Sequence, residues 1–164
     1  MLRSPWLTQG YVDNSEASEA LWAGGYLHTG DIAVVTPDGA IRITDRIKDV
    51  IKTGGEWVSS LQIEDLIEEF PGVQEAAVIG IPDEKWGERP LAFVVADADH
   101  ADGLHEADIK THLQTFAARG VIPKFGIPEM IRFVDRLEKT SVGKIDKKLL
   151  RETYAHIAQR QSAG

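Results

Sequence analysis

The sequence contains no cysteine, so it can form neither a disulfide framework nor a thiolate metal site. It also lacks an apolar run long enough to cross a membrane, and its first residues do not follow the basic-then-apolar order of a secretion signal. The net charge of -8 argues against general binding to nucleic acid, whose phosphates attract basic proteins. These absences predict a cytoplasmic protein with no transmembrane segment and no nucleic-acid partner.

What the chain does have is the composition of a folded protein. Hydrophobic residues make up 43% and charged residues 27% of its 164 residues, which leaves room for one ordinary domain or for a small domain with part of another. The charge is uneven, because residues 119–151 carry a clear excess of Lys and Arg over Asp and Glu. A basic end on an acidic chain suits a polyanionic small molecule such as a nucleotide or coenzyme A, although charge alone favours a basic surface that is simply solvated.

The stretch at residues 45–60 organises the rest of the chain. It opens with alternating charges, and Arg46, Lys48 and Lys52 offer cationic donors suited to phosphate or ribose oxygens. A Gly-Gly pair follows at 54–55, where the backbone can adopt positive φ or approach a ligand closely. The same residues are compatible with a charged connector, a short strand, a turn and a helix cap, so the neighbouring segments decide between the two interpretations.

The part before this stretch shows no pattern of a core that closes on itself. Residues 1–27 contain large aromatic side chains and turn-forming glycines. Two β-prone runs, at 32–36 and 40–44, flank a Pro-Asp-Gly turn and predict a hairpin, which in isolation is only marginally stable and is expected to dock elsewhere. Asp31 precedes the hairpin, where its carboxylate can accept hydrogen bonds from ribose hydroxyls or simply cap the strand.

Residues 50–155 carry the periodic patterns of a compact α+β unit. The predicted elements are, in order, a helix from residue 59, strands at 76–81 and 91–95, a helix at 106–119, a strand at 130–134 and a helix from residue 147. Ser59 and Gln62 form a capping-box pair at the start of the first helix. The acidic residues of that helix, among them Glu64 and Glu68, are expected to face water.

The later helices predict a buried face and no metal site. The last helix is expected to bury Leu150, Tyr154 and Ile157. His105 and His112 flank the apolar face of the middle helix, but no third ligand stands at metal-binding spacing. Both histidines are therefore interpreted as surface residues.

A short loop at residues 139–146 separates the last strand from the last helix. Gly143 makes this loop pliable, and Lys144 lies at its exposed end. A lysine on a mobile loop can reach a site held by another domain and neutralise developing negative charge. The competing interpretation is an ordinary exposed lysine, which is the fate of most lysines. The Gly-x-x-x-x-Gly-Lys spacing of a Walker loop is absent.

Six segments in register carry a resemblance to a known superfamily. They are residues 26–31, 45–49, 51–60, 75–80, 86–90 and 139–144. Together they resemble the C-terminal part of the adenylate-forming enzymes, and most closely the fatty-acyl-CoA synthetases. The Gly-Gly-Glu-Trp form at 54–57 is more similar to medium- and long-chain acyl-CoA synthetases than to luciferases or peptide-synthetase modules.

This resemblance implies a fold and a division of the chain. Residues 1–46 would be the C-terminal strip and hairpin of a large N-terminal adenylating domain. Residues 47–164 would be a mobile C-terminal lid, an α+β domain with a short antiparallel sheet flanked by helices. Lys48 would be the hinge residue about which the lid swings between two half-reactions.

The resemblance also implies a ligase reaction and a set of site residues. A fatty acid or other carboxylic acid would attack the α-phosphate of ATP, with magnesium present, to give acyl-AMP and pyrophosphate. The thiol of coenzyme A would then displace AMP. The residues implied in catalysis are Lys144 in the first step and Lys52 in the second. Those implied in binding ATP, AMP or coenzyme A are Asp31, Arg46, Lys48, Gly54, Gly55, Glu56 and Trp57.

The phosphate loop, acyl tunnel and magnesium-binding carboxylate of that superfamily have no counterpart in this sequence. The chain is therefore expected to be a fragment, or a subunit that needs a partner, and to be inactive alone. Residues 1–46 would then expose strands and aromatic rings, which predicts self-association. Two alternatives stay open: a non-catalytic module that binds a nucleotide, coenzyme A or a carrier protein, and an adenylation domain that serves an acyl carrier protein.

Overall fold

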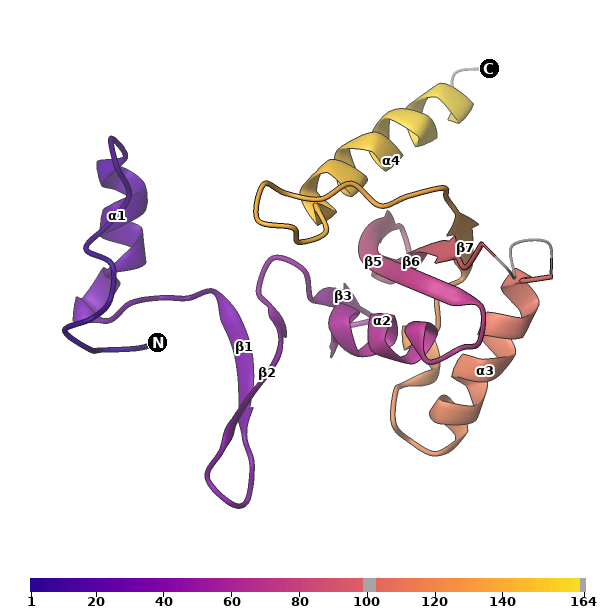
Figure 1. Cartoon of the computed structure of the whole chain (residues 1–164), viewed down its shortest axis with the longest axis horizontal. Helices are drawn as coiled ribbons and strands as arrows, with labels where there is room; N and C mark the ends of the chain where they lie inside the picture. The colour runs from indigo at the N-terminus through magenta and orange to yellow at the C-terminus, as the bar shows by residue number, and fades with distance from the viewer. Residues whose placement is uncertain (99–102, 163–164) are drawn as a thin grey trace. The chain divides into compact units, whose positions relative to one another are not determined.

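The computed structural model describes residues 1–98 and 103–162, with side chains described through Ala155 (Figure 1). The chain forms two compact units, Met1–Lys48 and Asp49–Gly164, each with its own internal contacts. Among the described residues, no helix combines the length and the apolarity that a membrane crossing requires.

The first unit is a short helix followed by a hairpin. Helix α1 spans Ser15–Leu21, a single 3-10 turn, η1, spans Ala23–Gly25, and the strands are β1 (Asp31–Val35) and β2 (Ile41–Arg46). The two strands pair antiparallel, as the turn-forming residues between them predict. The register shifts between Ile32 and Ala33, so the hairpin contains a β-bulge next to its open end, where Thr44 Oγ1 donates to Ile32 O at 3.2 Å.

Most large apolar side chains of the first unit are exposed. Leu27 is its one buried hydrophobic residue within the fully described stretch Met1–Lys48. Trp6 is 91% exposed, and Val35 and Ile41, which face each other across the hairpin, are 73% and 69% exposed. The first unit thus has almost no core of its own, as its lack of periodicity predicted.

The second unit is built around a five-stranded sheet in the order β4-β3-β6-β5, with β7 also pairing with β6. The strands are β3 (Ile51–Thr53), β4 (Glu56–Val58), β5 (Val73–Asp83), β6 (Gly87–Ala96) and β7 (Met130–Phe133). The pairs β3–β4, β3–β6 and β5–β6 are antiparallel, as expected. Strand β7 instead runs parallel to β6, because the chain crosses over through a helix between them.

Three helices cover the two faces of this sheet. They are α2 (Ser60–Glu68), α3 (Glu106–Ala118) and α4 (Lys147–Ser162), with a 3-10 turn, η2, at Lys124–Gly126. Successive residues of a strand point to opposite faces, so Ala76 and Val78 enter one core while Ala77 and Ile79 enter another. Helices α2 and α3 pack on the first face and α4 on the second, with the sheet between them in Figure 1.

The helix starts are close to their predicted positions. Ser59 Oγ accepts a hydrogen bond from Gln62 N at 3.1 Å and so caps α2. The side chain of Gln62 also links α2 to the segment after α3, because Gln62 Nε2 donates to Val121 O at 3.2 Å. Leu150 and Tyr154 pack against the second core, as expected, whereas the side chain of Ile157 lies outside the described residues.

Two predictions about polar residues were wrong. Glu64, expected to face water, is buried, because it accepts a hydrogen bond from Val78 N at 2.6 Å and pairs with a lysine of α4. His112, interpreted as a surface residue, is half-buried between Phe70 and Phe116, and its Nε2 lies 2.9 Å from Leu66 O. Both side chains have polar partners inside the fold that sequence spacing does not show.

Candidate functional site

In the first unit, the predicted nucleotide-binding residues Asp31 and Arg46 face each other. They occupy paired positions at the open end of the β1–β2 hairpin, and Arg46 Nε lies 3.5 Å from Asp31 Oδ1. The guanidinium side chain is 57% exposed, whereas the Asp31 side chain is only 24% exposed. A fixed carboxylate beside an exposed guanidinium can accept bonds from hydroxyls while donating to phosphate or ribose oxygens.

Asp45 holds the end of this hairpin, a role that the sequence reasoning did not find. Its side chain is buried, and Asp45 Oδ1 accepts a hydrogen bond from Arg46 N at 2.7 Å. Just before β1, Gly30 O accepts from Ile47 N at 2.8 Å, and the exposed Lys48 follows at the end of the unit. The only sequence signal for this role was an acidic residue directly before Arg46. Acidic residues next to arginines are common on protein surfaces, so this signal does not identify a buried carboxylate.

In the second unit, Lys52 and Trp57 form the exposed face of the β3–β4 hairpin. They are paired residues, and Lys52 Nζ lies 5.0 Å from the centre of the Trp57 ring, within range of a cation–π contact. Their neighbours Ile51 and Val58 point the other way, into the core. This alternation fixes the lysine and the indole on the outer face, where both can contact a ligand.

The Gly-Gly pair forms the tight turn of this hairpin. Gly54 and Gly55 have φ of 61° and 85°, the left-handed values that a two-residue turn between paired strands requires. Glu56 is exposed directly after the turn. The glycines were therefore identified correctly as a backbone device, and the two strands on either side bring Lys52 and Trp57 together.

The segment 86–90 supports this hairpin from the neighbouring turn. Gly54 N donates to Trp86 O at 2.8 Å, and Glu88 Oε2 accepts from Lys52 N at 2.8 Å. Lys85 Nζ lies 4.8 Å from the centre of the Trp86 ring. Two tryptophans and two lysines thus lie on adjoining hairpins. The anchoring role of Glu88 was not predicted, because its partner is distant in sequence.

Lys144 lies in a tight turn before α4. Thr140 N donates to Lys144 O at 2.7 Å, Gly143 N donates to Thr140 O at 2.9 Å, and Gly143 has a φ of 78°. The Lys144 side chain is exposed, and within the described part of the chain it makes no ion pair. Its ammonium group is therefore available to a ligand. The base of this turn is well ordered, because Lys139 and Ile145 form a β-bridge.

The structure brings the predicted residues together in three groups rather than one. Asp31 and Arg46 belong to the first unit, while the Lys52–Trp57 hairpin and the Lys144 turn are separate features of the second. Among the described residues, no cluster of three or more His, Asp or Glu side chains has the arrangement of a metal site. The described residues thus offer binding groups for an anion but no ligand set for magnesium.

Comparison with known proteins identifies a family for these features. The sequence profile of the family described as "AMP-binding enzyme C-terminal domain" matches residues 62–144. This range includes the segment at Trp86 and the turn that carries Lys144.

Curated relatives extend the similarity over almost the whole chain. A long-chain-fatty-acid–CoA ligase of Thermus thermophilus is 42% identical over 93% of this chain and 27% of its own length. A peroxisomal trans-cinnamate:CoA ligase of Petunia hybrida is 39% identical over 92% of this chain and 25% of its own length. The chain thus spans about a quarter of these relatives.

A solved structure has the same fold at similar coverage. The crystal structure of the anthranilate CoA ligase AuaEII, in complex with anthranoyl-AMP, superposes with a TM-score of 0.80 and 34% sequence identity. The superposition covers 92% of this chain and 28% of the other. Its α+β architecture matches the arrangement expected from the sequence.

Proposed function

Because the chain belongs to the family of AMP-binding enzyme C-terminal domains, we propose that it is the C-terminal portion of an AMP-forming acyl-CoA ligase. Residues 47–164 act as the mobile lid, and residues 1–46 complete the N-terminal adenylating domain. The observation that most supports this division is the boundary between two compact units at Lys48 and Asp49. A swing there requires few residues to change φ and ψ, and Lys48 is the hinge.

The proposed reaction has two steps that share one pocket. In the first, a carboxylate oxygen of the substrate attacks the α-phosphorus of ATP, and pyrophosphate leaves. In the second, the sulfur of coenzyme A attacks the acyl carbonyl carbon, and AMP leaves. A lid that swings between the steps presents different side chains to two different transition states.

Lys144 acts in the first step. Its exposed ammonium, on an ordered turn, reaches the carboxylate and the α-phosphate and stabilises the negative charge that develops during adenylation. Asp31 accepts hydrogen bonds from the ribose hydroxyls, and Arg46 donates to ribose or phosphate oxygens. The 3.5 Å separation of these two side chains lets both contact one nucleotide.

Lys52 and Trp57 act in the second step. After the swing, the Gly54–Gly55 turn and the exposed Glu56 and Trp57 line the path of the pantetheine arm of coenzyme A. The indole offers apolar area to the arm, and Lys52 offers a positive charge to its phosphates. The absence of side chains at the turn lets the backbone approach the arm closely.

The acyl substrate is a fatty acid in this proposal, since one of the similar proteins is a long-chain-fatty-acid–CoA ligase. Magnesium accompanies ATP and is held by residues outside this chain, because the described residues do not form a ligand set for it. The cytoplasmic location stays a prediction, which fluorescence microscopy of a tagged full-length protein tests directly.

The decisive experiment separates the two half-reactions in the complete enzyme. Lys144→Ala is expected to abolish ATP–pyrophosphate exchange while sparing thioester formation from supplied acyl-adenylate. Lys52→Ala or Trp57→Ala is expected to show the opposite bias. Lys148→Ala is the matched control, because this lysine is also exposed but pairs with Glu152 on α4. Equal loss of both half-reactions in Lys144→Ala would refute its assigned role.

Two other functions predict different results. A non-catalytic module is expected to bind ATP or coenzyme A at micromolar concentration without further protein, which calorimetry on the isolated chain measures. An adenylation domain serving a carrier protein is expected to transfer the acyl group to a phosphopantetheinylated protein faster than to free coenzyme A. The Lys52–Trp57 face favours coenzyme A, because it offers an exposed cation and an apolar ring side by side.

A further inference from the structure

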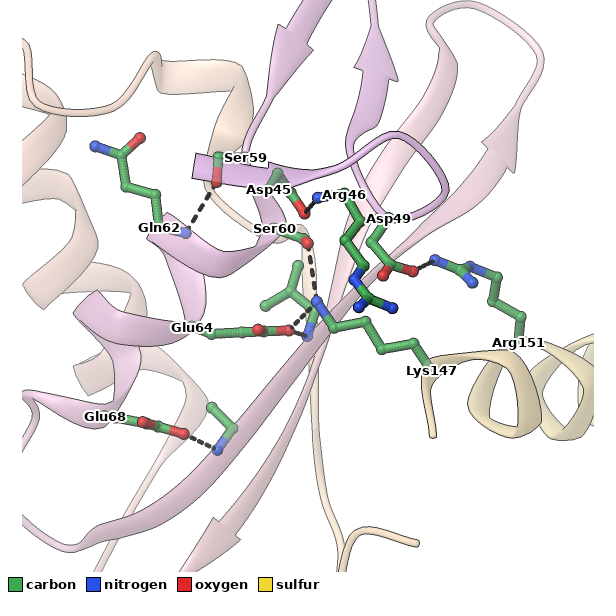
Figure 2. A network of polar contacts seen from close by, with 12 residues as sticks. Asp45, Arg46, Asp49, Ser59, Ser60, Gln62, Glu64, Glu68, Lys147 and Arg151 are labelled. Carbon is green, nitrogen blue, oxygen red and sulfur yellow. Dashed lines mark hydrogen bonds and ion pairs between the residues drawn. The ribbon is translucent and has the colours of Figure 1, made fainter. Parts of the chain in front are cut away.

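We infer that the buried ion pair between Glu64 and Lys147 positions the Lys144 turn for adenylation. This inference rests on the proposed function of Lys144. Lys147 Nζ lies 2.7 Å from Glu64 Oε1 and donates to Ser60 Oγ at 2.8 Å (Figure 2). The Glu64 and Lys147 side chains are only 8% and 10% exposed. A lysine three residues from the proposed catalytic lysine is thus held inside the fold.

The position of Glu64 is itself fixed by the sheet. Strand β5 lies at one end of the sheet order, and its outward N–H groups at Ala76 and Val78 are bound by Glu68 and Glu64 of α2, at 2.9 and 2.6 Å. Four helical residues rise about 6 Å and two strand residues about 6.7 Å, so the carboxylates and the N–H groups have matching spacing. The Glu64 carboxylate is therefore held in one position, where it can pair with a cation of α4.

Lys147 connects the fixed Glu64 carboxylate to the turn that carries Lys144. It is the first residue of α4, and the preceding Asp146 caps that helix by accepting from Leu149 N at 3.0 Å. Asp146 N also donates to Glu138 O at 2.8 Å, on the other side of the turn. The path from Glu64 to the turn thus runs through one ion pair and the start of one helix.

A second ion pair anchors the other side of the turn. Lys139 Nζ lies 2.7 Å from Glu75 Oε1, at the start of β5. The lysines on both sides of Lys144 are therefore bound to acids of the α2–β5 region. The Lys139 side chain is 48% exposed, so solvent weakens that pair, and the buried pair is the stronger constraint.

Stability alone does not account for a buried pair at this place. Removing two charges from water costs free energy, and apolar residues of similar size often stabilise a protein as well or better. An ion pair with several hydrogen bonds differs from an apolar contact because it permits few geometries. Fixing the start of α4 in one place is the property that the Lys144 turn requires, since misplacing a reacting group by about 1 Å can cost about a hundredfold in rate.

The test uses a double variant that removes the pair without leaving a buried charge. Glu64→Gln with Lys147→Met keeps an acceptor for Val78 N and fills the space of the lysine stem. In the complete enzyme, this variant is expected to lower kcat for adenylation about tenfold or more, with a smaller change in KM for ATP and little change in thioester formation from supplied acyl-adenylate. Lys147→Arg alone, which keeps the charge opposite Glu64, is expected to retain most of the adenylation rate of the parent enzyme. Lys148→Met is the matched control.

A second measurement does not depend on activity. In the 164-residue chain, hydrogen exchange at Thr140 N and Asp146 N, which close the turn, is expected to accelerate about tenfold in the double variant. Exchange at Val78 N, bound by residue 64 in both proteins, is expected to stay slow.

The outcomes separate this inference from the proposed function. An unchanged adenylation rate with unchanged exchange at the turn overturns the inference, and so does an equal loss of both half-reactions with faster exchange throughout the sheet. A parent enzyme with no ATP–pyrophosphate exchange overturns the proposed function instead. Hydrogen exchange then decides alone whether the pair positions the turn.

Discussion

Gly54 lies directly against the ring of Trp86. A Cβ atom at residue 54 would be 3.0 Å from Trp86 Cε3, and Gly54 N already donates to Trp86 O at 2.8 Å. The turn that brings Lys52 beside Trp57 thus depends on a residue with no side chain, for two reasons: its positive φ and the nearby indole. The neighbouring Gly55 has the first reason only, since nothing lies within 4 Å of its hypothetical Cβ.

Gly54→Ala is therefore expected to destabilise the chain more than Gly55→Ala. Both substitutions force an L residue into the left-handed region, which costs about 1–2 kcal/mol. Gly54→Ala adds the contact with Trp86, so its loss of unfolding free energy is expected to be larger by about 1 kcal/mol. Urea unfolding of the two variants measures the difference. Equal losses in both would show that the Trp86 ring moves aside without cost.

The β1–β2 hairpin and the glycine turn of the β3–β4 hairpin were predictable because their signals are local. Paired β-prone runs around Pro-Asp-Gly, and two adjacent glycines before Glu-Trp, each specify a turn within a few residues. The same holds for α2, whose apolar spacing and capping Ser59 lie in one short segment. Lys52 and Lys144, which lie beside such turns, were selected on that basis and by resemblance, and their roles stay predictions.

The remaining features depend on contacts between distant segments. The amphipathic pattern assigns Glu64 to the water-facing side, yet its partners are Val78 in β5 and Lys147 in α4. The parallel direction of β7 follows from a helical crossover, which no local pattern encodes. Glu88 likewise binds the backbone of Lys52 from another hairpin. Polar residues inside a fold are identified by their partners, and these cannot be read from spacing.

A substitution of His112 tests whether a polar side chain with partners inside the fold stabilises the protein. His112→Ala is expected to lower the free energy of unfolding by about 1–3 kcal/mol, because it removes the contact with Leu66 O and edge contacts with Phe70 and Phe116. His105→Ala is the matched control on the same helix. His105 is exposed and makes no side-chain capping bond, so a change within about 0.5 kcal/mol is expected. Similar values for the two variants would restore the surface interpretation of His112.

The β1–β2 hairpin is expected to drive self-association of the 164-residue chain. Val35→Lys with Ile41→Glu replaces two exposed apolar residues that face each other, and the opposite charges keep the strands paired. Sedimentation velocity should show the parent chain associating as concentration rises and the double variant shifting towards monomer. Val142→Lys, a change at an exposed valine of the second unit, should leave association unaltered. A parent chain that is monomeric at all concentrations would contradict this prediction.

Glu106 at the start of α3 is expected to make stability depend on acid pH. A hydrogen bond from Lys110, 2.6 Å away, holds the pKa of the Glu106 carboxyl below its ordinary value, against a smaller opposing effect of burial. The ionised carboxylate therefore favours the folded state. This contribution is complete above the pKa of Glu106 in the unfolded chain and is lost as pH falls through the lower pKa of the folded state. Because the side chain is 40% exposed, solvent limits the effect to less than about 1 kcal/mol.

NMR titration of Glu106 measures its pKa, which should rise in Lys110→Met. Urea unfolding of Glu106→Gln should differ most from the parent near neutral pH, with the difference shrinking in acid. A pKa that is the same with and without the Lys110 ammonium would contradict this assignment.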